Sequence, residues 1–102
     1  MFKIEADPTF EAAITIIGQG REQTLNVTFK HKTRAQYLSW LETLRNEEGA
    51  IAKAVLEIVQ RWDADAPLGI DSILALQDEQ PGADLAIIDA YGQALLVARR
   101  KN

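Results

Sequence analysis

Side chains able to do chemistry are few in this chain, which has one histidine, His31, and no cysteine among its 102 residues. A histidine that serves as a general base or a zinc ligand needs partner residues, and the sequence around His31 supplies none. His31 lies between two lysines at the end of a predicted strand, so we expect its ring to be solvated. The lack of cysteine excludes disulfides, thiolate metal sites and a cysteine nucleophile.

Three aspartates, Asp63, Asp65 and Asp71, have spacings similar to those of a calcium-binding loop. A loop of that kind starting at Asp63 needs a glycine at its sixth position and a glutamate at its twelfth. This chain has Leu68 and Leu74 at those positions. We therefore interpret the aspartates as an acidic loop followed by a helix N-cap, and predict no metal site.

Two further patterns fail as chemical sites. Gly18-Gln19-Gly20 lacks the additional glycine and the lysine of a phosphate loop, and a strand follows where that loop needs a helix. The glutamates of the predicted helices imply no apolar pocket, which favours a solvated face over acid–base catalysis. These glutamates are Glu42, Glu47, Glu48 and Glu57. We thus predict no catalytic residue and no cofactor, and do not expect an enzyme.

The bulk composition is that of one ordinary domain spanning residues 1–102, with 47% hydrophobic residues and a formal net charge of −4. Basic residues cluster at Lys30, Lys32 and Arg34, but no aromatic platform accompanies them, so we expect no nucleic-acid partner. The first residues lack the pattern of a signal peptide, and no apolar run is long enough to cross a membrane. We therefore expect a cytoplasmic protein with no membrane partner.

The elements that must position any functional residue begin with a predicted β-hairpin. Alternating apolar and polar residues predict strands at 10–17 and 24–31, joined by a glycine-rich turn at 18–22. The apolar residues of the second strand share one face, which is typical of a hairpin with one buried side. Residues 2–5 also alternate, so a short third strand there is an alternative to a hairpin of two strands.

Helical periodicity follows the hairpin and indicates about four helices. The first begins at a capping box in which Thr33 and Gln36 can each accept a hydrogen bond from the other's backbone. The predicted helices span 34–46, 48–62, 71–79 with Asp71 as the N-cap, and 83–100 with a basic last turn. The predicted class is therefore α+β: an N-terminal antiparallel hairpin, of two or three strands, followed by helices that make up most of the chain.

Large aromatic residues are the main candidates for a binding surface. Packing between helices accounts for at least two of them, and we expect one or two at the surface as anchors for a partner. Trp40 is the first choice, because it stands beside the apolar stripe formed by Ala35, Leu38, Leu41 and Leu44. The candidate partner-binding residues are Tyr37, Trp40, Trp62, Tyr91 and Arg34.

Six short segments keep an order and spacing that occur together in a known family. They are Leu25 to Tyr37, Arg61-Trp62-Asp63, Asp71-Ser72-Ile73-Leu74, Gln80-Pro81-Gly82, Asp89-Ala90-Tyr91 and Ala98 to Asn102. Together they resemble the tail assembly chaperones of long-tailed bacteriophages and the related prophage proteins. The resemblance covers most of the chain from residue 25 onward.

The resemblance implies a non-enzymatic protein of the host bacterial cytoplasm that is absent from the mature virion. Such chaperones bind the long, helix-rich tape-measure protein, keep it soluble and help the major tail-tube protein polymerise around it, and some self-associate. Many are made in two lengths by a ribosomal frameshift, and a chain ending at Asn102 would match the shorter product. The resemblance carries over no catalytic residue and no binding residue.

Two other functional classes stay open. One is a different structural component of a phage tail, such as a terminator or connector, which would remain in the particle. The other is a small DNA-binding regulator that uses the basic cluster at residues 30–34, whose DNA binding would depend steeply on salt. An enzyme is the class with the least support.

Overall fold

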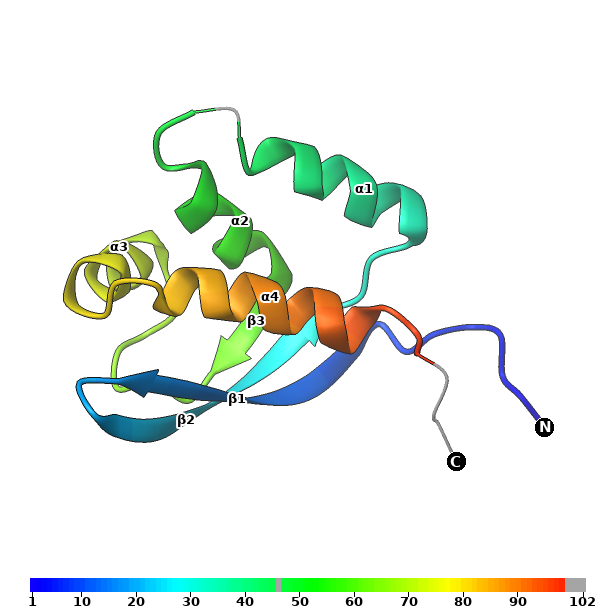
Figure 1. The fold of residues 1–102 in the computed structure, drawn as a ribbon. Coiled ribbons are helices and arrows are strands. Elements are labelled where there is room, and N and C mark those ends of the chain that lie inside the picture. The colour runs from blue at the N-terminus through cyan, green and yellow to red at the C-terminus, as the bar shows by residue number, and fades with distance from the viewer. Residues whose placement is uncertain (46, 99–102) are drawn as a thin grey trace.

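The computed structural model describes residues 1–45 and 47–98 of the chain. Within them, three strands form one antiparallel sheet in the order β1-β2-β3, and four helices complete the fold (Figure 1). The predicted α+β class is therefore confirmed. The elements are β1 (Thr9–Gly18), β2 (Arg21–Lys30), α1 (Arg34–Thr43), α2 (Ala50–Ile58), β3 (Val59–Trp62), α3 (Ile70–Glu79) and α4 (Ala83–Leu95).

The predicted β1–β2 hairpin is present, and its turn sets its register. Gln19 and Gly20 both have positive φ angles, 53° and 74°, as required at the centre of the two-residue turn whose twist matches that of paired strands. Gly18 pairs with Arg21 across this turn, and the pairing then continues without a shift along both strands. Inward-facing residues of the two strands therefore lie opposite each other and form one apolar face.

The third strand is not where the sequence placed it. Residues 2–5 form no strand, and α2 ends at Ile58 although the predicted helix continued to Trp62. Val59 has extended backbone and begins β3, which pairs antiparallel with β2. The apolar residues here fit a helical stripe as well as a strand, so pairing with the open edge of β2 decides the outcome.

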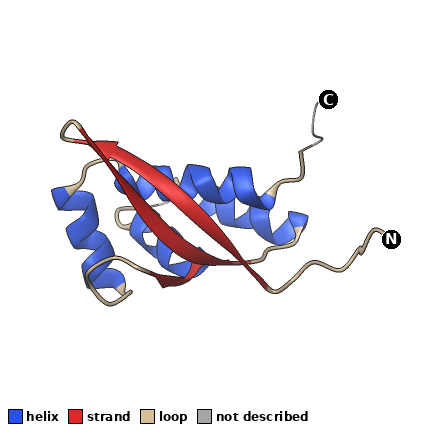
Figure 2. Cartoon of the chain, turned by 90° about the horizontal axis from the view of Figure 1, so that it is seen from below, coloured by secondary structure: helices blue, strands red, loops and turns tan. Residues whose placement is uncertain are grey.

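The four helices lie on one side of the sheet and leave its other face open (Figure 2). The core forms where the inner face of the sheet meets α2, α3 and α4. Its most buried large side chains, each with 0% of the residue exposed, are Phe29, Val55, Ile58, Ile73, Ile87 and Tyr91. Burial of this apolar surface is the main stabilising contribution, because each such side chain contributes about 1.5–3 kcal/mol relative to exposure.

The start of α3 differs from the predicted one. The helix begins at Ile70, so Asp71 lies in its first turn and is not the N-cap. Ser72 supplies the capping contacts: its Oγ accepts the Gly69 N–H at 3.1 Å and donates to the Pro67 carbonyl at 2.7 Å. Asp71 still lies near the positive end of the helix dipole, where a carboxylate is favourable.

Besides α2, two further helices end earlier than the sequence predicted. The helix predicted over 34–46 ends at Thr43, whose Oγ1 donates to the Trp40 carbonyl at 2.6 Å, and residue 46 lies outside the described residues. The helix predicted over 83–100 ends at Leu95. The basic residues expected at its last turn, 99–101, also lie outside the described residues.

Candidate partner-binding groove

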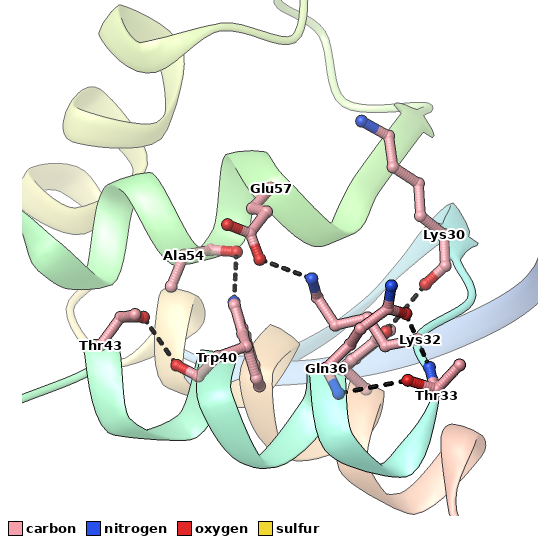
Figure 3. Close-up of polar contacts among 9 residues, drawn as sticks. Lys30, Lys32, Thr33, Gln36, Trp40, Thr43, Ala54 and Glu57 are labelled. Atoms are coloured by element: carbon pink, nitrogen blue, oxygen red, sulfur yellow. Dashed lines mark hydrogen bonds and ion pairs between the residues drawn. The ribbon is translucent and has the colours of Figure 1, made fainter.

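The start of α1 is held against α2 by polar contacts (Figure 3). Thr33 Oγ1 accepts the Gln36 N–H at 3.2 Å, and Gln36 Oε1 accepts the Thr33 N–H at 2.9 Å, which confirms the predicted capping box. One residue earlier, Lys32 Nζ lies 2.6 Å from Glu57 Oε2 on α2. These contacts fix where α1 begins and which way it runs.

Trp40 holds the middle of α1 to α2, so its predicted place at the surface is wrong. Only 3% of the residue is exposed. Its Nε1–H donates to the Ala54 carbonyl at 3.2 Å (Figure 3). The predicted stripe is correspondingly half right: Leu41 and Leu44 pack against the core, whereas Ala35 is exposed and Leu38 is 46% exposed. The face of α1 that packs on the protein consists of Tyr37, Trp40, Leu41 and Leu44.

Tyr91 of α4 is the centre of an aromatic cluster that joins the sheet to α1. Its ring centroid lies between 5.0 and 6.2 Å from those of four other rings, in one stacked, one tilted and two edge-on arrangements. Aromatic contacts at these distances are favourable. The four rings are Phe10, Phe29, Tyr37 and Trp40. Three of the predicted partner-binding residues, Tyr37, Trp40 and Tyr91, therefore belong to one cluster.

The Tyr91 hydroxyl is buried with its residue and has one protein partner. It donates a hydrogen bond to the Lys30 carbonyl at the end of β2, at 2.8 Å. Burial raises the pKa of Tyr91 to about 12, with smaller contributions from the charge of Glu57 and from Tyr37. The fold therefore favours the neutral phenol, which can donate where a phenolate cannot.

An open apolar groove of about 650 Å³ lies between α1 and α4, and we call it the α1/α4 groove. Its apolar lining comes from both helices and from the segment that follows α4: Tyr37, Leu41, Ile88, Gly92, Leu96 and Val97. Leu96 and Val97 are 54% and 98% exposed. Apolar side chains thus remain accessible at the groove, as at many protein-binding surfaces.

Gly92 allows α1 and α4 to approach at the base of the groove. A Cβ atom on Gly92 would lie 2.9 Å from the Tyr37 hydroxyl oxygen, closer than side-chain atoms normally come. The missing side chain therefore lets the Tyr37 ring lie against the backbone of α4. Any larger residue here would require the Tyr37 side chain to shift.

The polar part of the lining is small and carries negative charge. Asp89 and Gln93, one turn apart on α4, are joined by a hydrogen bond of 2.9 Å from Gln93 Nε2 to Asp89 Oδ2. The groove therefore combines apolar walls with a carboxylate at its edge. That combination matches an amphipathic helix that carries a basic residue beside its apolar stripe.

Of the five predicted partner-binding residues, only Tyr37 lines the α1/α4 groove. Trp62 lies in β3 and donates its Nε1–H to the Ala66 carbonyl at 2.8 Å, so its polar atom is satisfied within its own loop. Arg34 is exposed at the first position of α1. The structure thus brings Tyr37 to the groove, buries Trp40 and Tyr91 in the aromatic cluster that the Tyr37 ring contacts, and leaves Trp62 and Arg34 elsewhere.

The basic cluster at residues 30–34 is partly neutralised. Lys32 has a side chain that is 17% exposed and pairs with Glu57, whereas Lys30 and Arg34 are exposed. His31 is partly buried, where full solvation was expected, and its backbone N–H donates to the Pro8 carbonyl at 2.9 Å. A continuous basic surface for a phosphate backbone is therefore not formed by residues 30–34.

The Asp63 carboxylate is occupied by protein contacts. Its oxygens accept hydrogen bonds from the Asn26 side-chain amide at 2.7 Å and from the Asn26 backbone N–H at 2.8 Å. These two bonds, of which the side-chain bond has the larger effect, hold the pKa of Asp63 below its ordinary value.

Among residues 1–45 and 47–98, no group of three or more His, Cys, Asp or Glu side chains is placed to hold a metal ion. In the same residues, no helix has the length and apolar character to cross a membrane.

Sequence reasoning missed the α4 wall of the groove. Neither Gly92 nor Leu96 was singled out as a candidate site residue. A signal was available, because Ile88, Gly92 and Leu96 recur every four residues and so share one helix face. A glycine between two apolar residues in a helix interior also indicates a close approach by another group.

Comparison with known proteins gives one match. A family model described as phage tail assembly chaperone matches residues 1–102, which is the whole chain. No curated protein and no solved structure matches the chain.

Proposed function

Because the chain belongs to the phage tail assembly chaperone family, we propose that it binds the tape-measure protein of a long phage tail. It keeps that protein soluble and helps recruit subunits of the tail tube. The role of the family is non-enzymatic, and we propose no catalytic step, cofactor or metal for this chain. Its place of action is the cytoplasm of the host bacterium, and the finished virion does not contain it.

The observation that carries the proposal is the accessible α1/α4 groove. It occurs in a chain that matches this family along its whole length. A long helical client exposes apolar stripes until the tail tube covers them, and a groove between two helices can shield one such stripe. Tyr37 and Leu41 supply one wall, and Ile88 and Leu96 supply the other. Asp89 at the edge selects client helices with a flanking Lys or Arg.

The test is co-expression of the chain with the tape-measure protein of the same phage, followed by measurement of the soluble fraction and of co-purification. Leu96→Glu introduces a charge at the groove, and we expect it to weaken binding about fivefold or more, as loss of an interface anchor does. Leu85→Glu is the matched control. Leu85 is 56% exposed against 54% for Leu96, lies on α4, whose last residue directly precedes Leu96, and does not line the α1/α4 groove.

The outcomes separate the function from the site. If the wild-type chain neither co-purifies with the tape-measure protein nor raises its solubility, the client proposal is wrong. If both variants bind as the wild type does, the chaperone role stands and the α1/α4 groove is not its site. Thermal unfolding of both variants must match that of the wild type for either comparison to hold.

The alternatives from the sequence are tested by different measurements. Mass spectrometry of purified virions would detect a terminator or connector and would not detect an assembly chaperone. A DNA-binding regulator has less support, because Lys32 is paired with Glu57 and residues 30–34 form no continuous basic surface. DNA binding with a steep salt dependence would nevertheless argue for it.

A further inference from the structure

β1 is an edge strand ten residues long, with β2 on one side and no strand on the other in the part of the chain that the structure describes. Its pairing with β2 is uninterrupted, so no bulge twists the free edge away. Within the strand there is no proline and no lysine, and Glu11 is its only charged residue. Long edges without these protective features are the ones that accept another strand.

The backbone groups on this edge can be identified from the far side of β2. Asn26 directs its backbone toward β3, because its N–H donates to Asp63 Oδ1 at 2.8 Å and its carbonyl accepts the Asp63 N–H at 3.1 Å. Ala13, which lies opposite Asn26, therefore directs its own N–H and carbonyl away from β2. The alternation along a strand extends this to Glu11, Thr15 and Ile17.

We infer that β1 is a homodimerisation edge, on which the β1 strand of a second copy pairs antiparallel about a two-fold axis through Ala13. The two three-stranded sheets then become one continuous sheet. This inference does not depend on the client or on the α1/α4 groove, which lies on the helical side of the fold. An isologous contact of this kind closes on itself and yields a dimer.

The side-chain sequence of β1 is self-complementary in this register. Glu11 lies opposite Thr15 of the second copy, and Ala13 lies opposite its own equivalent, all on the open face of the sheet. On the inner face, Phe10 lies opposite Ile16, so an aromatic ring meets a β-branched side chain at each end of the contact. Phe10 and Ile16 are both only partly buried in the single chain, so pairing would cover them further.

Neighbouring registers fit less well. An axis through Ile14 places Glu11 opposite Ile17, which leaves a charge against an apolar side chain that is 71% exposed. An axis through Glu11 places the two Glu11 carboxylates directly opposite each other, which is destabilising. The axis through Ala13 avoids both contacts and keeps nearly the whole length of β1 paired.

Ala13→Cys tests the register directly, because the chain has no other cysteine. Opposed residues of a hydrogen-bonded antiparallel pair have Cα atoms about 5.5 Å apart, which suits a disulfide. Under mild oxidation the variant should form a covalent dimer on a non-reducing gel. Thr24→Cys is the control, since Thr24 is also exposed on the open face but lies on β2, away from the proposed axis.

Charge changes at Thr15 test the same contact in solution. Thr15→Lys creates two symmetric pairs with Glu11 and should tighten dimerisation about 2- to 30-fold, whereas Thr15→Glu should weaken it by a similar factor. Adding Glu11→Lys to Thr15→Glu should restore the dimer. Thr24→Glu is the control for a charge on the open face away from the edge, and sedimentation equilibrium over a range of concentrations is the measurement.

Support requires that the Thr15 variants shift the monomer–dimer equilibrium in opposite directions while Thr24→Glu leaves it unchanged. A wild-type chain that stays monomeric at every concentration overturns the inference. A dimerisation constant that neither Thr15→Lys nor Thr15→Glu changes also overturns it, and so does equal cross-linking of Ala13→Cys and Thr24→Cys. Circular dichroism melts of each variant establish that the fold persists, because every substituted side chain is on the exposed face.

Discussion

Replacing Tyr91 with phenylalanine removes one buried hydroxyl and keeps the ring that packs at the centre of the aromatic cluster. The wild-type hydroxyl donates to the Lys30 carbonyl at 2.8 Å. Loss of this hydrogen bond should lower the free energy of unfolding by about 1 kcal/mol near neutral pH. The ring contacts remain in Tyr91→Phe, so no large cavity adds to that figure.

The effect of Tyr91→Phe should depend on pH, and the direction follows from the pKa of Tyr91. That pKa is raised from 10.0 to about 12 in the folded protein. The folded protein therefore holds the phenol proton more tightly than the unfolded chain does. The stabilisation is fully present below pH 10.0 and is lost as the pH rises toward about 12. By about pH 11 the wild type should have lost about 1.4 kcal/mol that the variant, having no hydroxyl, does not lose.

Wild type and Tyr91→Phe should therefore differ by about 1 kcal/mol near pH 7 and become equally stable close to pH 11. Urea unfolding at a series of pH values measures this, and all other titrating groups are shared, so they cancel in the difference. A difference that stays constant from pH 7 to pH 11 would refute the reasoning. It would mean that the Tyr91 hydroxyl ionises as freely in the folded state as in the unfolded state.

Three further substitutions test other parts of the structure. Trp40→Ala should lower the free energy of unfolding by about 3–5 kcal/mol in urea titrations, because it leaves a cavity where a side chain is only 3% exposed. A loss below about 1 kcal/mol would instead indicate that the ring lies at the surface. Thr33→Ala should cost about 1 kcal/mol by removing the N-cap acceptor of α1, whereas Thr33→Asp, which keeps an acceptor, should stay near the wild type. Gly92→Ala should be close to neutral, since the helix propensity gained, about 1 kcal/mol, is offset by displacement of the Tyr37 hydroxyl. In a Tyr37→Phe background the same Gly92→Ala change should stabilise the protein, and an equal effect in both backgrounds would contradict the contact.

Features determined by neighbouring residues were predictable from the sequence. The turn at Gln19-Gly20 and the capping box of Thr33 and Gln36 both depend on groups a few residues apart, and both are present in the structure. Chain-local geometry decides such features, so periodicity and turn chemistry are sufficient to find them. The hairpin and the sequence of four helices follow from the same kind of signal.

Features that depend on distant partners were not predictable in the same way. Val59 continues the apolar spacing of α2, and only the open edge of β2 makes the segment from Val59 to Trp62 a strand. Trp40 was placed at the surface because the leucines nearby defined the stripe. The spacing of Tyr37, Trp40, Leu41 and Leu44, at i, i+3, i+4 and i+7, is in fact the better amphipathic pattern, and the structure follows it.

The groove illustrates a further limit. Its walls come from α1 and α4, which are about fifty residues apart in the sequence, and no single-helix pattern shows that they face each other. Tyr37, Trp40 and Tyr91 were candidates from the sequence, but the burial of Trp40 and Tyr91 could not be deduced without the position of α4. The accessible residue Leu96 was not singled out, because the predicted helix ran through it to residue 100, whereas in the structure Leu96 directly follows the end of α4.

The position of β3 has a consequence for the order in which the protein folds. The β1–β2 hairpin closes through its own turn, and such hairpins form in about 1–10 μs. β3 pairs across a much longer loop, since Asp63 bonds Asn26 at a separation of 37 residues and Arg61 contacts Thr28 at a separation of 33. Closing that loop requires α1 and α2 to be positioned first, so completion of the sheet is a late, non-local step. In this order, the surroundings of Trp40 in α1 form before those of Trp62 at the end of β3. Variants that retain only one of the two tryptophans should therefore report different refolding phases by fluorescence. Identical phases would argue against this order.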